Sequence, residues 1–352
     1  MKKIVTVVGA RPQFIKAAAV SRELRKYSDI NEIIVHTGQH YDASMSEVFF
    51  DQMSIPQPQY NLGVGGGGHG KMTGRQLEKI EEILVEEMPD YVLVYGDTNS
   101  TLAGALAAAK LHIPVAHVEA GLRSYNRRMP EEVNRVLTDH ISSLLFVPTA
   151  HAAENLRKEG IIGNNVIKVG DVMLDVTLFY KERAIKPIWF DGLNIDEFSY
   201  ILCTIHRAEN TDDISRLNGI FDGLRDGGLP VVLPIHPRTQ NVIKEWKLAV
   251  PNNVHIVPPA GYFEMLWLQA HCNKVATDSG GVQKEAYFHG KYCITLRDET
   301  EWVELVENGL NELVGADAAR IAKAIASNPQ RTFVPGLYGN GNAAHHIVEA
   351  LK

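Results

Sequence analysis

Short apolar runs alternate with helix-like segments along most of this 352-residue chain. Each run is short enough for a buried strand, and the segments between them carry apolar residues at helical spacing. Because parallel strands need a crossover connection, usually a helix, this alternation predicts parallel sheets and an α/β fold. The strands are predicted at residues 3–8, 32–36, 91–95, 113–119, 144–147, 166–169, 200–204, 230–235, 253–257, 274–277 and 292–296. Helices are predicted at residues 13–27, 73–87 and 342–351, and a glycine-rich loop at 61–70.

The number of predicted strands indicates two sheets rather than one. A chain of this length also corresponds to about two domains. We expect two Rossmann-like domains: residues 1–168 with a C-terminal helix in 340–352, and residues 169–339. The boundary is placed near residues 169–171, ahead of an irregular segment at 181–198.

Composition excludes several classes of protein. The net charge of −7 gives no broad basic surface for nucleic acid, so any anion site must be built locally. The three cysteines are scattered in apolar contexts, which argues against a disulfide framework and fits a reducing compartment. No window reaches the roughly 18 apolar residues of a membrane span, and the first residues do not resemble a signal peptide. We expect a cytoplasmic protein that binds neither nucleic acid nor a membrane.

The stretch from His117 to Arg135 carries two carboxylates around one loop. Glu119 ends a predicted strand, and Glu131 lies in the first turn of a helix that Pro130 opens. Arg135 is four residues after Glu131 and shares its helix face. Ligands of open α/β sheets bind at the carboxyl ends of the strands. We therefore expect Glu119 and Glu131 in a ligand site.

The helix that Pro130 opens also carries an apolar stripe. Apolar residues at helical spacing normally face the core of a domain. We expect this of Val133, Val136, Leu137 and Ile141.

Two further strand ends in the first half carry charged residues. Arg11 and Lys16 follow the first strand at the start of a helix, where backbone N–H groups favour an anion. The alternative is two solvated cations. Asp97 follows another strand, and it either caps the next helix or acts in chemistry. Beside Glu119 and Glu131 we favour chemistry.

The second half repeats this placement. His206 follows a strand, where it is either an ordinary loop residue or a phosphate ligand. Ser279, Gly280 and Gly281 lie between a strand and a helix, so that their amides can reach a diphosphate. Glu285, about one helical turn later, is placed to accept hydrogen bonds from ribose hydroxyls. A glycine-rich turn without a ligand is the alternative.

Several common sites are missing from the sequence. The histidines at 117, 206 and 236 are isolated, so no metal site is expected. The turn after the first strand is neither a dinucleotide fingerprint nor a P-loop, and no nucleophile elbow is present. We therefore expect no metal and no cofactor.

These motifs, taken together and in order, resemble the non-hydrolysing UDP-N-acetylglucosamine 2-epimerase family. The resemblance covers essentially the whole chain. The motifs are residues 9–16, 96–98, 117–123, 130–135, the loop at His206 and residues 278–281. The resemblance implies the glycosyltransferase-B architecture, with two Rossmann-like domains and the active site in the cleft between them. It also implies a UDP-sugar substrate, a homodimer and a role in surface polysaccharide biosynthesis.

The resemblance implies a reaction and the residues that perform it. The family inverts C2 of a UDP-2-acetamido sugar by anti elimination of UDP to a glycal and re-addition of UDP. The implied catalytic residues are Asp97, Glu119, Glu131 and His206. The implied substrate-binding residues are Arg11, Lys16, Arg135, Met265, Ser279, Gly280, Gly281 and Glu285.

Three segments resemble one subgroup of the family, which epimerises UDP-2,3-diacetamido-2,3-dideoxy-D-glucuronate to the manno sugar. They are residues 9–16, 126–132 and 300–305. That substrate carries a carboxylate at C6, and a bidentate arginine is its strongest partner. Arg127 and Arg128 both lie just before Pro130, and of the two we assign Arg128 to this carboxylate because it is closer to the start of the helix. A solvated surface arginine is the alternative reading.

The chain departs from the commoner family pattern at a few positions. Ala10 and Gln13 replace a threonine and a glutamate, and Trp302 replaces an arginine that contacts the ligand. Gln39 and His40 match the pair used by an allosteric site in bacterial members, but the residues around them diverge.

Other functions remain open on the sequence alone. The first is a UDP-N-acetylglucosamine 2-epimerase, and the second is a UDP-sugar glycosyltransferase of the same architecture. A transferase needs one base and an acceptor groove, whereas three carboxylates suit elimination and re-addition. The third is a nucleotide-sugar sensor, for which the sequence offers no effector domain.

Overall fold

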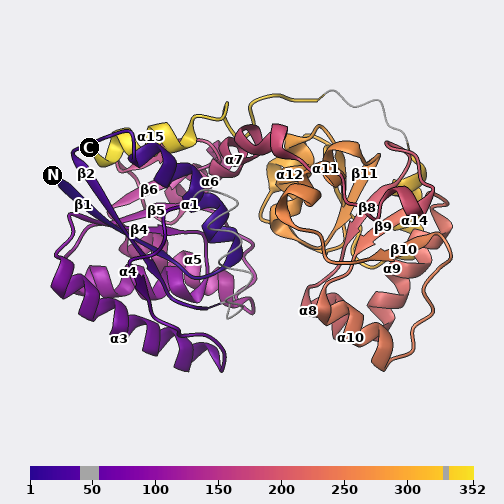
Figure 1. Ribbon diagram of the computed structural model, residues 1–352, viewed down its shortest axis with the longest axis horizontal. Helices are drawn as coiled ribbons and strands as arrows, with labels where there is room; N and C mark the ends of the chain where they lie inside the picture. The colour runs from indigo at the N-terminus through magenta and orange to yellow at the C-terminus, as the bar shows by residue number, and fades with distance from the viewer. Residues whose placement is uncertain (40–54, 328–332) are drawn as a thin grey trace. The chain divides into compact units, whose positions relative to one another are not determined.

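The computed structural model of the protein describes residues 1–39, 55–327 and 333–352. These residues form two compact units (Figure 1). Unit 1 consists of Met1–Leu178 and Gly336–Lys352, and unit 2 of Phe179–Pro335. Each unit contains one parallel sheet flanked by helices, which confirms the predicted α/β class. The predicted domain boundary at residues 168 and 169 stays a prediction.

Within the described residues, unit 1 holds a seven-stranded sheet in the order β3-β2-β1-β4-β5-β6-β7. The strands are β1 (Lys2–Val8), β2 (Ile30–His36), β3 (Tyr60–Asn61), β4 (Tyr91–Tyr95), β5 (Val115–Val118), β6 (Leu144–Val147) and β7 (Val166–Lys168). The strand order reverses between β1 and β4, so the loops after these two strands diverge and leave room for a ligand. Arg11, Lys16 and Asp97 follow these two strands.

Helices cover both faces of the unit 1 sheet. The helices are α1 (Arg11–Leu24), α3 (His69–Glu87), α4 (Asn99–Lys110), α5 (Pro130–Ile141), α6 (Ala150–Lys158), α7 (Val172–Tyr180) and α15 (Ala343–Leu351). Apolar side chains of α3 and α4 pack on the face that carries Val5, Val7 and Val94. The C-terminal helix α15 packs on α1, and Asp175 accepts hydrogen bonds from the first backbone amides of α15.

Unit 2, as far as the structure describes it, holds a six-stranded sheet in the order β10-β9-β8-β11-β12-β13. The strands are β8 (Ile201–Thr204), β9 (Val231–Pro234), β10 (Val254–Val257), β11 (Lys274–Thr277), β12 (Tyr292–Thr295) and β13 (Asn311–Leu313). The helices are α8 (Ala208–Thr211), α9 (Ile214–Asp226), α10 (Pro237–Glu245), α11 (Tyr262–His271), α12 (Gly280–Phe288), α13 (Val303–Glu307) and α14 (Ala318–Ala326). One apolar cluster joins α9 and α14 to the sheet, and a second joins α11 and α12 to its other face.

The structure adds elements that the sequence pattern did not predict. The strands β3 and β13 have only two and three residues and were missed. Helix α3 begins at His69 rather than at residue 73, so the predicted glycine-rich loop is shorter than expected. Its first turn is held by a contact between the His69 ring and the Asn99 amide at 3.1 Å, which offsets the low helix propensity of its glycines.

The prediction for the apolar stripe of α5 was wrong for Val133 and Leu137 but right for Ile141, which packs on the apolar core of unit 1. The side chains of Val133 and Leu137 are 43% and 48% exposed, and Val136 and Ile141 are only half-buried. The residues of α5 that are buried are polar: Glu132, Asn134, Arg135, Thr138 and Asp139. The physical reason is that this face of α5 lies on the loops after β4 and β5, whose polar groups need hydrogen-bond partners.

Among the residues that the structure describes, none of the helices combines the length and the apolar character that crossing a bilayer requires.

Candidate functional site

The turn between β1 and α1 is fastened to the end of β4 by Gln13. Its side-chain oxygen accepts hydrogen bonds from the amides of Gly9 and Ala10, at 2.8 and 3.0 Å. Its side-chain nitrogen donates to the Tyr95 carbonyl and the Thr101 hydroxyl, both at 2.9 Å. Gln13 is buried, so these four bonds fix the start of α1 against the strand that precedes Asp97. The sequence analysis named Gln13 as a departure from the family but gave it no function.

Lys16 and Glu119 form an ion pair beside Gly96. Both side chains are largely buried. Glu119 has a backbone φ of 74°, a conformation that costs energy for any residue except glycine. The amides of Glu119 and Ala120 hold this turn by donating to the Phe146 carbonyl, both at 3.1 Å. A Cβ atom at position 96 would lie 3.3 Å from both charged groups, so a glycine gives the pair its room.

Asp97 is held by Arg135 of α5. The Arg135 Nε and Nη2 atoms both donate to Oδ2 of Asp97, the Nε contact at 3.1 Å. Its Nη1 donates to Glu132 Oε2 at 2.9 Å, so one buried guanidinium bridges two carboxylates. Asn134 also donates to the Asp97 main-chain oxygen, at 2.9 Å. Helix α5 therefore determines where Asp97 lies.

Glu131 and Glu132 are neighbours with different surroundings. Glu132 is 2% exposed and accepts hydrogen bonds from the amides of Ser124 and Tyr125 at 2.9 and 2.8 Å. Together with the Arg135 contact, these bonds make Glu132 a structural residue of the loop before α5. Glu131 is exposed in the first turn of α5 and is open to a ligand.

The predicted residues of unit 1 meet only in part. Lys16, Glu119, Asp97 and Arg135 form one set around Gly96. Arg11 is the first residue of α1 and is half-buried. Arg128 is exposed, and its backbone amide donates to the Asn126 side chain at 3.1 Å. Within the described residues, no hydrogen bond or ion pair connects the side chains of Glu131 or Arg128 to this set.

A buried network lies directly behind this set. His117 Nδ1 lies 2.7 Å from Asp139 Oδ1, and His117 Nε2 lies 2.8 Å from the Gly96 carbonyl oxygen. Asp139 Oδ2 accepts hydrogen bonds from the Gly121 amide at 3.0 Å and from Arg123 Nη1 at 2.7 Å. Burial alone would raise the pKa of the Asp139 carboxyl, but His117 and Arg123 hold it below its usual value. The sequence analysis missed Asp139, although the spacing of 132, 135 and 139 marks one polar face of α5.

In unit 2, His206 is fixed by Asp278 at the carboxyl ends of β8 and β11. Asp278 is fully buried and accepts from the amides of His206 and Arg207, both at 2.9 Å, and from Asn210 at 3.2 Å. His206 Nδ1 lies 3.1 Å from Asp278 Oδ1. Burial opposes ionisation, yet these donors lower the pKa of the Asp278 carboxyl below its usual value. Because Nδ1 of His206 faces Asp278, Nε2 is the ring nitrogen available to a ligand.

The start of α12 offers backbone amides. Ser279 is its N-cap, and the Ser279 amide donates to the Thr277 hydroxyl at 2.9 Å. A Cβ atom on Gly280 would lie 2.6 Å from Glu301 Oε1, so a larger residue there would displace the Glu301 carboxylate. Glu285 Oε2 accepts a hydrogen bond from buried Gln269 at 2.7 Å, which orients its carboxylate.

Two further predicted contacts of unit 2 have clear surroundings. Met265 of α11 is partly buried and packs on the apolar cluster between α11, α12 and the sheet. Trp302 is 3% exposed, and the Lys284 Nζ atom lies 4.1 Å from the centre of its ring. The Lys284 cation therefore lies beside Trp302, the residue that replaces the arginine of the commoner family pattern.

The matched allosteric pair is described only in part. The side-chain oxygen of Gln39 accepts from the amide and the hydroxyl of Ser100, at 3.0 and 2.8 Å. His40 lies outside the described residues.

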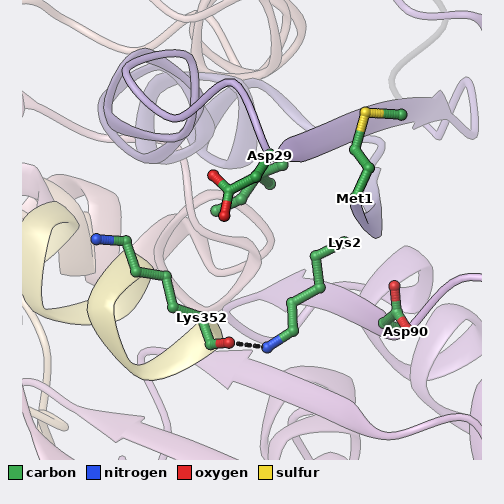
Figure 2. Close-up of a pocket in the computed structure, with 6 residues that line it drawn as sticks. Met1, Lys2, Asp29, Asp90 and Lys352 are labelled. Carbon is green, nitrogen blue, oxygen red and sulfur yellow. Dashed lines mark hydrogen bonds between the residues drawn. The ribbon is translucent and has the colours of Figure 1, made fainter.

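Two cavities have linings that the structure defines, one at the chain ends and one beside α5. A cavity of about 330 Å³ is lined by both chain ends, with Lys2 donating to the Lys352 carbonyl oxygen (Figure 2). Asp29 and Asp90 in its wall precede β2 and β4, so it lies at the amino ends of the strands, opposite the edge where ligands bind. A second cavity of about 320 Å³ lies beside α5, lined by Arg123, Tyr125, Arg127, Glu132, Val136, His140 and Glu159. A search of the described residues finds no cluster of metal-ligating side chains.

Comparisons with known proteins agree with this arrangement. The family model for UDP-N-acetylglucosamine 2-epimerase matches residues 22–352. The chain is 53% identical to the UDP-2,3-diacetamido-2,3-dideoxy-D-glucuronate 2-epimerase of Pseudomonas aeruginosa, covering 99% of both chains. It is 51% identical to a UDP-N-acetylglucosamine 2-epimerase homolog of Methanococcus maripaludis, again over 99% of both. The fold is also similar to a crystal structure of the Methanocaldococcus jannaschii UDP-GlcNAc 2-epimerase in complex with UDP-GlcNAc and UDP. The TM-score is 0.90 and the sequence identity 44%, and the match covers 100% of this chain and 99% of that chain.

Proposed function

The chain belongs to the UDP-N-acetylglucosamine 2-epimerase family, and on that premise we propose that it epimerises UDP-2,3-diacetamido-2,3-dideoxy-D-glucuronate at C2 to the manno sugar. It is an isomerase that acts on a UDP-sugar. The observation that carries the proposal is the pairing of each carboxylate after β4 and β5 with a cation, Asp97 with Arg135 and Glu119 with Lys16. The full-length similarity to the Pseudomonas enzyme supports the choice of sugar.

The proposed chemistry needs a base for a weakly acidic C–H bond. One carboxylate removes the proton from C2 while the C1–oxygen bond breaks, which gives a glycal and UDP. A proton then returns to the opposite face of C2, and UDP adds back to C1. Asp97, Glu119 and Glu131 are assigned these proton transfers, which require carboxylates within hydrogen-bond reach of C2.

The departing UDP must be retained until it adds back. We assign it to unit 2, where Gly280 and Gly281 offer backbone amides, Ser279 offers its hydroxyl and Glu285 offers an acceptor for the ribose hydroxyls. Met265 is assigned to the uracil. His206 is assigned to the phosphates through Nε2, and Arg11 and Lys16 are assigned to stabilising the negative charge that develops as the bond breaks.

The uronate is distinguished from UDP-N-acetylglucosamine by its C6 carboxylate and its acetamido group at C3. Arg128, exposed just before α5, is assigned to the C6 carboxylate. Trp302 is assigned to the wall of the pocket around the C3 acetamido group.

The proposal is tested by NMR of candidate UDP-sugars incubated with the protein in deuterated water. We expect deuterium at C2 of the uronate, formation of the manno epimer and much slower turnover of UDP-N-acetylglucosamine. Equal turnover of both sugars would exclude the uronate specificity and leave the second candidate, a UDP-N-acetylglucosamine 2-epimerase. Consumption of sugar only in the presence of an acceptor, with release of UDP, would instead indicate a glycosyltransferase.

We also propose that the chain forms a homodimer and supplies a sugar for a surface polysaccharide. Light scattering over a range of protein concentrations measures the first point. A mass equal to the 39.0 kDa chain at all concentrations would exclude the dimer.

A further inference from the structure

We propose that His117 is a positioning residue for the C2 epimerisation, held as a buried imidazolium that fixes the three segments carrying Asp97, Glu119 and Glu131. The positioning role rests on the proposed function, whereas the protonation state stands on geometry alone. His117 is fully buried and is not among the residues assigned to the sugar or to UDP.

The hydrogen bonds of His117 require a proton on both ring nitrogens. Nε2 faces the Gly96 carbonyl oxygen at 2.8 Å, and a carbonyl only accepts hydrogen bonds. Nδ1 faces Asp139 Oδ1 at 2.7 Å. A neutral imidazole has a single N–H group and would leave a lone pair against one of these oxygens.

The proton belongs to His117 rather than to Asp139. The other oxygen of Asp139 accepts from the Gly121 amide at 3.0 Å and from the Arg123 guanidinium at 2.7 Å. Contact with a second cation favours the ionised carboxylate. Arg123 is in turn paired with Glu159 at 2.7 Å, so two cations and two carboxylates balance within the network.

The network connects the segments that carry the three proposed carboxylates. One of its hydrogen bonds is accepted by Gly96, the residue before Asp97 at the end of β4. Gly121, whose amide donates to Asp139, is two residues after Glu119, and His117 is two residues before Glu119. Asp139 comes from α5, whose first turn carries Glu131.

The backbone at these points is unusual and needs support. Gly96 after β4 and Gly121 after β5 have φ values of 61° and 81°. Glu119, two residues before Gly121, has a φ of 74°. For Glu119 this conformation persists only because the surroundings impose it. His117 and Asp139 support this backbone through their hydrogen bonds to Gly96 and Gly121. Removing them should let the Glu119 and Asp97 carboxylates move, although neither side chain is assigned to the sugar.

The protonation state is tested on the wild-type protein by NMR of ¹⁵N-labelled histidine. We expect one buried histidine with protons on both ring nitrogens. The signal is assigned by its loss in His117→Asn. A His117 ring with one bare nitrogen near neutral pH would overturn the imidazolium.

The positioning role is tested by kinetics of His117→Asn and Asp139→Asn, with His140→Asn as the matched control. The shorter asparagine side chain of the first variant would keep at most one of the two bonds that the imidazole makes. We expect kcat and the rate of deuterium entry at C2 to fall together by about 10²-fold, as for a small misplacement of reacting groups, with KM changed by less than about threefold. His140 lies on the same helix, is 46% exposed and bonds the Val136 carbonyl within that helix. Its Nδ1 lies 3.9 Å from Glu159 at the exposed end of the network and, within the residues that the structure describes, does not contact His117 or Asp139, so its variant should match wild type.

The outcomes separate the two proposals. An unchanged kcat per folded molecule in His117→Asn, with only a lower melting temperature, would reduce His117 to a structural residue. If His117→Asn does not fold, the signal is assigned by its change in Asp139→Asn, whose hydrogen bond to the ring is lost, and the kinetics of that variant decide the positioning role. Absence of deuterium exchange by wild-type protein would overturn the proposed epimerisation and the positioning role with it, while the imidazolium would stand or fall by NMR.

Discussion

Unit 1 and unit 2 present charged groups at the carboxyl ends of their strands in two different ways. In unit 1 the carboxylates of Asp97 and Glu119 are each paired with a cation on a neighbouring helix. In unit 2 the buried carboxylate of Asp278 binds backbone amides and His206, and the start of α12 offers amides of its own. Under the proposed function, unit 1 would move protons through side chains and unit 2 would hold an anion through its backbone.

The comparison predicts that carboxylate variants in unit 1 lose turnover without losing UDP. Asp97→Asn, Glu119→Gln and Glu131→Gln should each lower kcat by about 10²- to 10⁴-fold, the usual contribution of an acid or base. UDP affinity, measured by calorimetry, should change by less than about threefold. Near-normal kcat in all three variants would break the assignment of proton transfer to unit 1.

The neighbouring carboxylates on α5 sharpen this test. Glu132→Gln should lower the free energy of unfolding by about 3 kcal/mol or more, because it breaks a buried pair with Arg135. Glu131→Gln should stay within about 0.5 kcal/mol of wild type, as expected for an exposed position. Both values come from denaturant unfolding. A reversal of the two effects would show that Glu131, not Glu132, supports the loop.

Substrate choice is predicted to depend on one exposed arginine. Arg128→Ala should lose about 2 kcal/mol or more against the uronate, roughly 30-fold in kcat/KM, because a carboxylate buried in the complex would lack its partner. The loss against UDP-N-acetylglucosamine should be small. Arg127→Ala is the matched control, being an exposed neighbour in the same loop. Equal losses in the two variants would argue against a specific contact with Arg128.

The smallest predicted effect concerns acid stability of unit 2. The pKa of Asp278 is lowered in the folded protein, so its stabilising contribution is complete above the ordinary value of 3.8 and is lost as pH falls below it. As the pH falls below 3.8, wild-type protein should therefore lose stability more steeply than Asp278→Asn. Unfolding curves across this pH range measure the two slopes. Identical slopes would show that Asp278 is not held as an ionised group.

Much of the fold follows from the sequence because buried parallel strands are short apolar runs. The strands that were missed, β3 and β13, have two and three residues and are defined mainly by pairing with β2 and β12. The apolar stripe of α5 was assigned to the core, whereas the structure buries its polar face. Periodicity identifies an amphipathic helix, but it does not say which face meets polar loops.

For the candidate site, the sequence indicates which residues lie near the carboxyl ends of the strands but not which residues pair with them. Asp97, Glu119, His206 and Ser279 follow predicted strands, so topology alone places them at the edges of their sheets. Their partners are further away in sequence: Arg135 lies 38 residues from Asp97, and Asp278 lies 72 residues from His206. Such pairs depend on how helices pack on loops, which no local pattern contains.

The central claim is that the C1–oxygen bond breaks while UDP stays bound, and positional isotope exchange tests it most directly. The uronate substrate would carry ¹⁸O in the bridge between C1 and the β-phosphorus. If UDP leaves and adds back, the label should move from the bridge to the non-bridging β-phosphate positions, as seen by ³¹P NMR, at a rate at least equal to epimerisation. Retention of all ¹⁸O in the bridge while C2 acquires deuterium and inverts would contradict elimination and re-addition.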